Sequence, residues 1–429
     1  MLFKNITILD ENFEIKNNMF VATKDEKVAY IGETEPMEDY GEIYDGKGKL
    51  LMPGFYNAHA HSPMTLLRGY GENMSLQDWL FNRIFPFEDH LNSNAVYYGQ
   101  LLAMAESLRF GIVSNSDMYY FIDDMYRATK EAGLKANICR SVSHFDDSDP
   151  WQGERLKEMK RTYEAYHMTE NGKIKIDISL HSEYTNNMLS IQAVTDYAKS
   201  VDAIIHIHIS ETKSEHEECK ERHNGLTPIQ LFNKVGSWDM PSVAAHCVWI
   251  EGEDFDIIKE KGITVAANPI SNLKLASGVS NVPEMLRRGI KVAIGTDSVC
   301  SNNSLNFFEE MKAFATASKM MYKDPTAVTP KETLYAATIA GALAQGREDC
   351  GLLKEGFKAD LIVVDINKPN MHPIHNMLNN IVYSADGGDV VLTMVDGKVL
   401  YRDGKYETLD IEKVIFEAEK ATKGILSEL

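Results

Sequence analysis

The middle of the chain alternates short apolar runs with amphipathic stretches. Eight runs rich in apolar and β-branched residues are typical of strands, and most are followed by stretches with helical spacing, such as 93–110 and 124–133. This alternation predicts a parallel sheet whose strands are joined by helices. The eight predicted strands cover 50–61, 110–119, 134–143, 174–183, 202–211, 242–250, 263–272 and 290–298.

The two ends of the chain follow another pattern. Residues 1–50 alternate polar and apolar positions between Asn, Asp and Gly turns, which predicts short strands. The same alternation of polar and apolar residues occurs in ADLIVVD and DVVLTMVDGKVLYRDGKY, within 359–406. The last stretch, 411–429, has helical spacing.

Nearly every predicted strand of the middle region ends in polar or ionisable residues. A (β/α)8 barrel needs this polarity, because its active site lies at the carboxyl ends of the strands. A doubly wound open sheet is the alternative, and it would place one polar cluster at a switch point. The residues concerned are His59, His61, Asp117, Arg140, His181, Glu183, His208, Glu211, His246, Asn268 and Asp297.

Two histidines, His59 and His61, are separated by one residue at the end of the first predicted strand. Residues i and i+2 share a strand face, so both imidazoles can reach one ion. Alone this pair is weak evidence, because ordinary core or surface histidines are common. Histidines at the ends of two further strands, His208 and His246, and the carboxylate of Asp297 strengthen it. Such a set, with a position open to water, describes a catalytic hydrolytic metal such as Zn²⁺, Fe²⁺ or Ni²⁺.

The other histidines are expected to have ordinary roles. His206 lies two residues before His208 on the same strand face, and we expect it to be a hydrogen-bonded histidine of the barrel interior. Four others, which lie in polar, helical or loop contexts, are expected on the solvated surface: His144, His167, His216 and His223.

Composition and charge narrow the function classes. The 429 residues carry 63 acidic and 44 basic side chains, a net charge of −19, which makes a nucleic-acid binder a poor interpretation. No apolar run approaches the roughly 20 residues needed to cross a membrane. The five cysteines are scattered without a C-x-x-C pair, so we expect neither disulfides nor a thiolate zinc site, and a cytoplasmic location.

Several motifs resemble the amidohydrolase superfamily, and within it the 5'-methylthioadenosine/S-adenosylhomocysteine deaminase family. They are HAH, HISE, AAHC, NPISNLKLASG and GTDSVCSNNSLNFFEEM, and the similarity runs over almost the whole chain. The resemblance implies one divalent metal ion per chain, most simply zinc, with iron or nickel as alternatives. It implies the ligands His59, His61, His208 and Asp297.

The resemblance also implies a division of the chain. Residues 51–357 would form the amidohydrolase barrel. Residues 1–50 and 358–429 would form a composite β-sandwich beside it, with the terminal helix at the end of the second part. A homo-oligomer is expected as well.

The implied reaction is hydrolytic deamination of an adenosine-type nucleoside, namely S-adenosylhomocysteine, 5'-methylthioadenosine or adenosine. Metal-activated water attacks C6 of the purine. Glu211, three residues after His208, is placed to protonate N1. His246 and Asp297 can orient the water and take its proton. The ordinary interpretation of Glu211 is a carboxylate at the start of a helix, where acidic residues are favoured.

Substrate contacts follow from the same resemblance. Glu88 occupies the place of a carboxylate that grips the ribose hydroxyls, and His181 that of a histidine against the base or ribose. Arg140 and Arg155 can face the carboxylate of a homocysteine tail, because arginine binds carboxylates in a bidentate way. For Arg155 a solvated helix charge is an equal alternative.

Two residues depart from the pattern of the family. Glu183 stands where relatives often have proline, and Ser298 where Gly or Ala is common, so both could alter specificity. A second hypothesis is a hydrolase of another aminated or halogenated ring, such as guanine, cytosine or an s-triazine. A third is a binding protein that keeps the barrel without catalysis. Deaminases with a C-x-x-C zinc motif are excluded.

Overall fold

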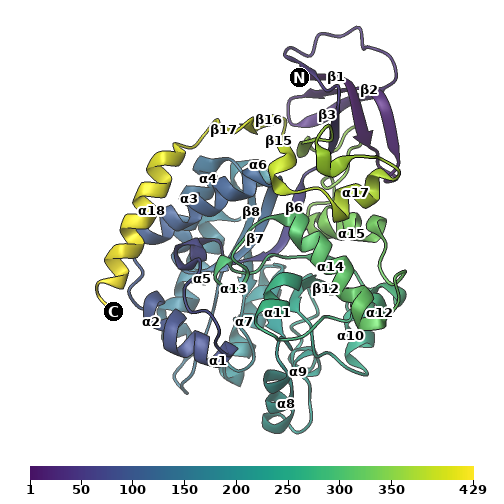
Figure 1. The fold of residues 1–429 in the computed structure, drawn as a ribbon. Coiled ribbons are helices and arrows are strands. Elements are labelled where there is room, and N and C mark those ends of the chain that lie inside the picture. Colours follow the sequence, from purple (N-terminus) through teal and green to yellow (C-terminus); the bar gives the residue numbers. More distant parts are fainter.

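Eight parallel strands form a nearly closed barrel in the computed structural model, which describes residues 1–429 (Figure 1). They are hydrogen-bonded in sequence order, and a bridge between Ala60 and Asp297 brings the last strand beside the first. The predicted (β/α)8 barrel is confirmed, and the open sheet is not observed. Its strands are β6 (Phe55–Ala60), β7 (Ile112–Tyr119), β8 (Lys135–Arg140), β9 (Ile174–Ser179), β10 (Ile205–Ile209), β11 (Ser242–His246), β12 (Thr264–Ala267) and β13 (Val292–Ile294).

The barrel strands are buried along almost their whole length, because side chains fill the inside and helices cover the outside. Apolar faces of the helices enter a cluster of 72 buried residues that unites them with the strands. The main covering helices are α3 (Ser93–Arg109), α4 (Ile122–Ala132), α5 (Glu154–Tyr166), α7 (Met188–Ser200), α8 (Lys213–Arg222), α9 (Pro228–Val235), α10 (Asp254–Glu260), α12 (Val282–Arg287), α14 (Phe307–Tyr322), α15 (Pro330–Ala337) and α16 (Ile339–Ala344).

Local sequence marks where several of these helices begin and end. Asn187, Thr227 and Thr329 precede α7, α9 and α15, and each forms a capping box with the third residue of its helix. Gly236 ends α9 with φ of +88°, a conformation that costs glycine little. Helix boundaries therefore follow short-range chemistry, whereas the burial of the helices follows their packing on the barrel.

Strands from both chain ends form a second, nine-stranded sheet, so the predicted small sheet domain is confirmed. Figure 1 shows the N-terminal strands in purple at the same end of the molecule as the late strands in yellow-green. The strands are β1 (Leu2–Leu9), β2 (Ile15–Lys24), β3 (Lys27–Gly32), β4 (Ile43–Asp45), β5 (Lys49–Pro53), β14 (Leu361–Asp365), β15 (Val390–Val395), β16 (Lys398–Arg402) and β17 (Lys405–Tyr406).

The two faces of this sheet have different partners. In β5, Leu50 and Met52 belong to the large cluster shared with the barrel, whereas Leu51 belongs to a separate cluster of 13 buried residues. Ile362 and Leu361 divide in the same way in β14. Because side chains alternate along a strand, one face of the sheet packs against the barrel and the other face contributes to a separate hydrophobic core.

The predicted first barrel strand, 50–61, is two strands that belong to different sheets. β5 pairs with β1 and β14 in the outer sheet, and β6 pairs with β7 in the barrel. Gly54 lies between them, and a Cβ there would stand 2.3 Å from Val113. A side chain cannot fit at this junction, which explains the glycine. The boundaries predicted for the three parts of the chain stay predictions.

The segment between β6 and α3 covers part of the barrel mouth. It contains a 3-10 helix (Ser62–Leu67), α1 (Leu76–Trp79), a short π-helix (Leu80–Ile84) and α2 (Phe85–Glu88). The terminal helix α18 (Ile411–Leu426) packs on α3 and on the 3-10 helix, along the flank of the barrel (Figure 1). None of the helices is both long and apolar enough to span a membrane.

Candidate active site

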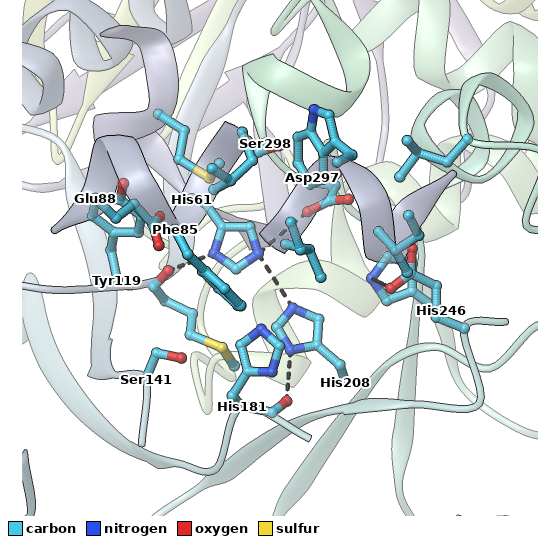
Figure 2. Close-up of a pocket in the computed structure, with 18 of the residues that line it drawn as sticks. His61, Phe85, Glu88, Tyr119, Ser141, His181, His208, His246, Asp297 and Ser298 are labelled. Atoms are coloured by element: carbon cyan, nitrogen blue, oxygen red, sulfur yellow. Dashed lines mark hydrogen bonds and ion pairs between the residues drawn. The ribbon is translucent and has the colours of Figure 1, made fainter. Parts of the chain in front are cut away.

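The side chains predicted as metal ligands converge at the carboxyl ends of the barrel strands. Figure 2 shows three of them, His61, His208 and Asp297. His59 lies in β6 and His61 directly follows it, His208 lies in β10, and Asp297 comes three residues after the end of β13. Nε2 of His61 lies 3.2 Å from Nε2 of His208 and 3.3 Å from Oδ1 of Asp297. The same Oδ1 lies 3.6 Å from Nε2 of His59. The ligating atoms are therefore close enough to share one ion.

In the neutral rings of His61 and His208, the hydrogen bonds place the proton on Nδ1 and leave Nε2 without one. Nδ1 of His61 donates to the carbonyl oxygen of Met118, and Nδ1 of His208 donates to that of His181, at 2.6 Å for the second pair. Because a neutral imidazole carries one proton, the two Nε2 lone pairs then face each other. Such an arrangement is repulsive unless a cation lies between them.

His59 completes the set with a nitrogen atom that has no hydrogen-bond partner in the protein. Its Nδ1 lies 3.0 Å from Nε2 of His206, and its Nε2 is buried without a hydrogen bond. Burial lowers the pKa of His59 to about 3 and holds the pKa of His208 well below its usual range. Both rings are therefore neutral, the form that binds metals. The donor set fits one divalent cation, and His206 is the interior histidine expected.

Glu211 and His246 lie beside this cluster. Oε2 of Glu211 is 3.7 Å from Nε2 of His246, and both side chains are buried. Burial raises the pKa of Glu211, so its carboxyl group is suited to hold a proton. The helix-start interpretation of Glu211 is wrong, because Glu215 has that place: its carboxylate accepts from the backbone N–H groups of Ser210 and Glu211.

Backbone conformation at two of these positions is unusual for residues with side chains. His246 has φ of +71° and Asp297 has φ of +59°. Each position costs free energy for a residue other than glycine, so the surrounding structure must enforce it. The sharp turn at each strand end directs the imidazole and the carboxylate into the mouth of the barrel.

Two adjoining hollows open beside the cluster, and Phe85, Glu88 and Tyr120 line both. Figure 2 shows Glu88 and His246 on opposite sides of the His61–His208 pair. The inner hollow is also lined by His61, Met64, Leu76, Trp79, Leu80, Ile84, Met118, Tyr119, Ser141, His181, Tyr184, His208, Glu211, His246, Leu275, Asp297 and Ser298. The outer one is also lined by Phe81, Asp89, Leu91, Phe121, Arg140, Ser143, Phe145 and Arg155.

Glu88 lies where the two hollows meet, at the end of α2. Burial raises the pKa of its carboxyl group to about 7, against the opposing effect of the hydroxyl of Tyr119. A carboxylate deprived of water gains much from new hydrogen-bond donors.

Both predicted arginines line the outer hollow. Nε of Arg140 lies 2.6 Å from the carboxylate of Glu158, and its guanidinium lies 4.6 Å from the ring centre of Tyr120. Arg155 is exposed and donates to the carbonyl oxygen of Ser143. Two cationic groups thus lie on the side of Glu88 away from the ligand cluster.

The structure resolves the surroundings of the remaining candidates. His181 lines the inner hollow, and burial lowers its pKa to about 3, so its ring is neutral. Ser298 lines the same hollow. The carboxylate of Glu183 is directed elsewhere, to Arg222 at 2.6 Å and His223 at 2.7 Å.

The expected surface position of His216 is wrong. Its ring is buried, and Nδ1 lies 3.0 Å from the hydroxyl of Ser210. Nε2 lies 3.3 Å from the carboxylate of Glu251. The helix α8 that carries His216 turns this side chain towards the barrel, a direction that a polar helical stretch of sequence does not reveal.

Sequence reasoning missed two sets of residues. Aromatic side chains from the segment after β6 and from the end of β7 wall the inner hollow, among them Trp79, Phe85 and Tyr119. Ser271 and Ser301 both donate to Oδ2 of Asp297, at 2.5 and 3.0 Å. Both serines lie in motifs that had pointed only to the family, NPISNLKLASG and GTDSVCSNNSLN.

An eight-stranded parallel barrel with three histidines and an aspartate at its strand ends defines the class of metal-dependent barrel hydrolases. Residues 50–400 match the amidohydrolase family, and this chain belongs to that family.

Similar proteins cover nearly the whole chain. The 5-methylthioadenosine/S-adenosylhomocysteine deaminase of Dictyoglomus thermophilum is 40% identical over 420 residues, which are 98% of this chain and 97% of that protein. The 5'-deoxyadenosine deaminase of Methanosarcina mazei is 39% identical over 409 residues, 95% and 94% of the two chains. The crystal structure of an adenosine deaminase from Xanthomonas campestris with bound zinc has a TM-score of 0.93 at 27% identity, covering 99% and 98%.

Proposed function

We propose that this chain deaminates adenosine-type nucleosides, with S-adenosylhomocysteine, 5'-methylthioadenosine and adenosine as candidate substrates. One observation carries the proposal. The inner hollow has the Glu211–His246 pair on one side of the ligand cluster and the half-buried carboxyl group of Glu88 on the other. The Glu211–His246 pair suits proton transfer to and from a base, and the carboxyl group of Glu88 suits hydrogen bonds with a ribose. The names of the similar proteins support the same substrate class.

His59, His61, His208 and Asp297 would hold one divalent ion, which when bound makes hydroxide available near neutral pH. Nε2 of His59, which is buried without a hydrogen-bond partner, supports this assignment. We favour zinc, since imidazole and carboxylate ligands suit it and a similar structure contains it. Iron or nickel would fit the same donors.

The protein's own groups would move the protons. Oxygen of water bonds to C6 while Glu211, whose pKa is raised by burial, donates a proton to N1 of the purine. His246 and Asp297 orient the water, and one of them accepts the proton that water loses and passes it to the amino group. The C6–N bond breaks and ammonia leaves while the hydroxyl at C6 returns a proton to Glu211, so that the 6-oxo product is an inosine analogue.

Glu88 would bind the 2' and 3' hydroxyls of the ribose. Two hydroxyl donors suit a carboxylate that has lost water. His181, held neutral by burial, would contact the base or the ribose in the inner hollow. Its Nδ1 lies 3.0 Å from the hydroxyl of Ser182, which leaves Nε2 for the ligand.

Arg140 and Arg155 would bind the carboxylate of a homocysteine tail in the outer hollow. Arg140 is already paired with Glu158 on one side, so its remaining N–H groups would take the tail. The pairing positions the guanidinium without using all five of its donors.

Ammonia release from a panel of substrates tests the proposal. The panel contains 5'-substituted adenosines, adenosine, adenine, guanine, cytosine and an s-triazine. We expect the adenosines to be deaminated far faster than any free base. Faster turnover of guanine or a triazine than of every adenosine would move this chain to the second hypothesis, a hydrolase of another aminated or halogenated ring. The homo-oligomeric state and the cytoplasmic location stay predictions.

A further inference from the structure

One segment of the chain, residues 268–280, lies behind all three groups proposed to move protons. It comprises the residues after β12, α11 (Pro269–Lys274) and the loop that follows. Three of its side chains contact these groups: Ser271 Oγ lies 2.5 Å from Asp297 Oδ2, Asn272 Oδ1 lies 2.8 Å from His246 Nδ1, and Ser277 Oγ lies 3.5 Å from Glu211 Oε1.

The contact of Asn272 has a chemical consequence that the other two lack. A serine hydroxyl can donate or accept, but an amide oxygen only accepts. Nδ1 of His246 must therefore carry a proton if it bonds to Oδ1 of Asn272. In a neutral ring the second nitrogen, Nε2, is then bare, and this is the nitrogen that faces Glu211 and the inner hollow.

Ser280 supports this orientation of the Asn272 amide. The hydroxyl of Ser280 donates to the carbonyl oxygen of His246 at 2.7 Å, which leaves its oxygen to accept. Nδ2 of Asn272 lies 3.4 Å from the hydroxyl oxygen of Ser280. The amide nitrogen therefore points to Ser280, and the amide oxygen points to the imidazole. All three side chains are buried, so water does not compete for these bonds.

We infer that Asn272 is a positioning residue that holds His246 in the tautomer with the proton on Nδ1, so that Nε2 can accept a proton from water. The inference rests on the role proposed for His246. It gives the NPISN motif a chemical purpose, since α11 brings Asn272 beside a residue 26 positions earlier in the chain.

A second asparagine favours the opposite tautomer. Nδ2 of Asn268 lies 3.2 Å from the same Nδ1 of His246, and it could donate only to a bare nitrogen. This contact is longer than that of Asn272, and the amide of Asn268 lacks an orienting partner such as Ser280. The two amides thus compete, and removal of Asn272 should let Asn268 set the tautomer.

The test is Asn272→Leu, which keeps the approximate size of the side chain and removes the acceptor. In ¹⁵N spectra of zinc-loaded, histidine-labelled protein, we expect the wild type to show His246 with a protonated Nδ1. The variant should show a protonated Nε2. We expect kcat to fall roughly 10-fold, about the net worth of one hydrogen bond, with little change in KM and unchanged zinc content.

Asn272→Asp and Asn281→Leu complete the set. The aspartate keeps an acceptor, so it should retain the Nδ1–H tautomer even if the leucine variant does not fold. Asn281 caps the next helix by accepting from Glu284 N–H, and its replacement tests general damage to the region. We expect it to leave the tautomer and kcat as in the wild type.

An unchanged tautomer in Asn272→Leu, or a protonated Nε2 in Asn272→Asp, would overturn the inference. A shifted tautomer with wild-type kcat would also overturn it. Failure of the wider proposal is separate: His246→Gln with full turnover would remove the catalytic role of His246, while the spectra would still decide what Asn272 does.

Discussion

The barrel carries two buried polar clusters, one at each end of its strands. At the carboxyl ends lie the ligand histidines and Asp297. At the amino ends, against the outer sheet, Lys135 lies among Tyr56, Asp360 and Asp396. Strand β8 joins the two regions, because it begins with Lys135 and ends with Arg140.

The two clusters differ in how their polar atoms are satisfied. Nζ of Lys135 contacts the carboxylates of both Asp360 and Asp396, at 2.6 Å for the second, and the hydroxyl of Tyr56 donates to Asp360. At the mouth, Nε2 of His59 has no partner. A cluster whose charges pair internally serves the fold, whereas one that leaves lone pairs bare in a buried site is built for a ligand. Substitutions at the mouth should therefore affect activity, and those at the base should affect stability.

The largest effect is expected for His59→Ala combined with His61→Ala. The double variant loses two of four metal donors, so we expect no bound metal and no measurable turnover, while the protein stays folded. Elemental analysis of purified protein and circular dichroism measure the two outcomes. His375→Ala, on an exposed loop, serves as the control. Stoichiometric metal in the double variant would contradict the ligand assignment.

Glu211→Gln keeps the shape of the side chain but cannot give up a proton as a carboxyl group does. We expect turnover to fall on the order of 10²–10⁴-fold, as for loss of a general acid–base group, with metal content unchanged. Glu217→Gln, on the exposed side of α8, should keep wild-type turnover. If Glu211→Gln raised only KM, the proton-transfer role would be wrong.

Lys135→Met tests the other end of the barrel. It leaves the carboxylates of Asp360 and Asp396 buried without their main cation, which should lower the free energy of unfolding by about 3–5 kcal/mol. Urea denaturation measures the loss, and kcat/KM of the folded protein should not change. Lys160→Met, at an exposed position, should shift the urea midpoint little. A wild-type midpoint for Lys135→Met would show that this cluster does not stabilise the fold.

Glu88→Ala should have the smallest effect of the four. Removal of a charged partner of hydroxyl groups costs roughly 1.5–3 kcal/mol, so kcat/KM for a nucleoside should fall on the order of 10–150-fold. A 2',3'-dideoxy analogue should be affected little, because it already lacks those hydroxyls. Kinetics of both substrates with both proteins check this. Equal losses for the two substrates would rule out ribose recognition by Glu88.

The parts of this protein that sequence predicted correctly are those that depend on short-range pattern. The alternation of strands and helices, together with polar residues at the strand ends, predicted the barrel. The positions of His59, His61, His208 and Asp297 at strand ends predicted that these side chains converge. The resemblance of the motifs predicted the family, which is confirmed. The split of 50–61 into two strands was missed, because periodicity continues across Gly54 although the sheet changes.

The sequence by itself determined which residues could act and on which strands they lie, because side-chain alternation and helix capping are local properties of the chain. The tertiary structure alone decided their chemical state. Closure of the barrel brings Ser271 to Asp297 and Asn272 to His246, contacts that span 26 residues in each case. Burial raises the pKa of Glu211 and leaves Nε2 of His59 bare. Protonation and hydrogen bonding depend on neighbours that only the packed fold brings together.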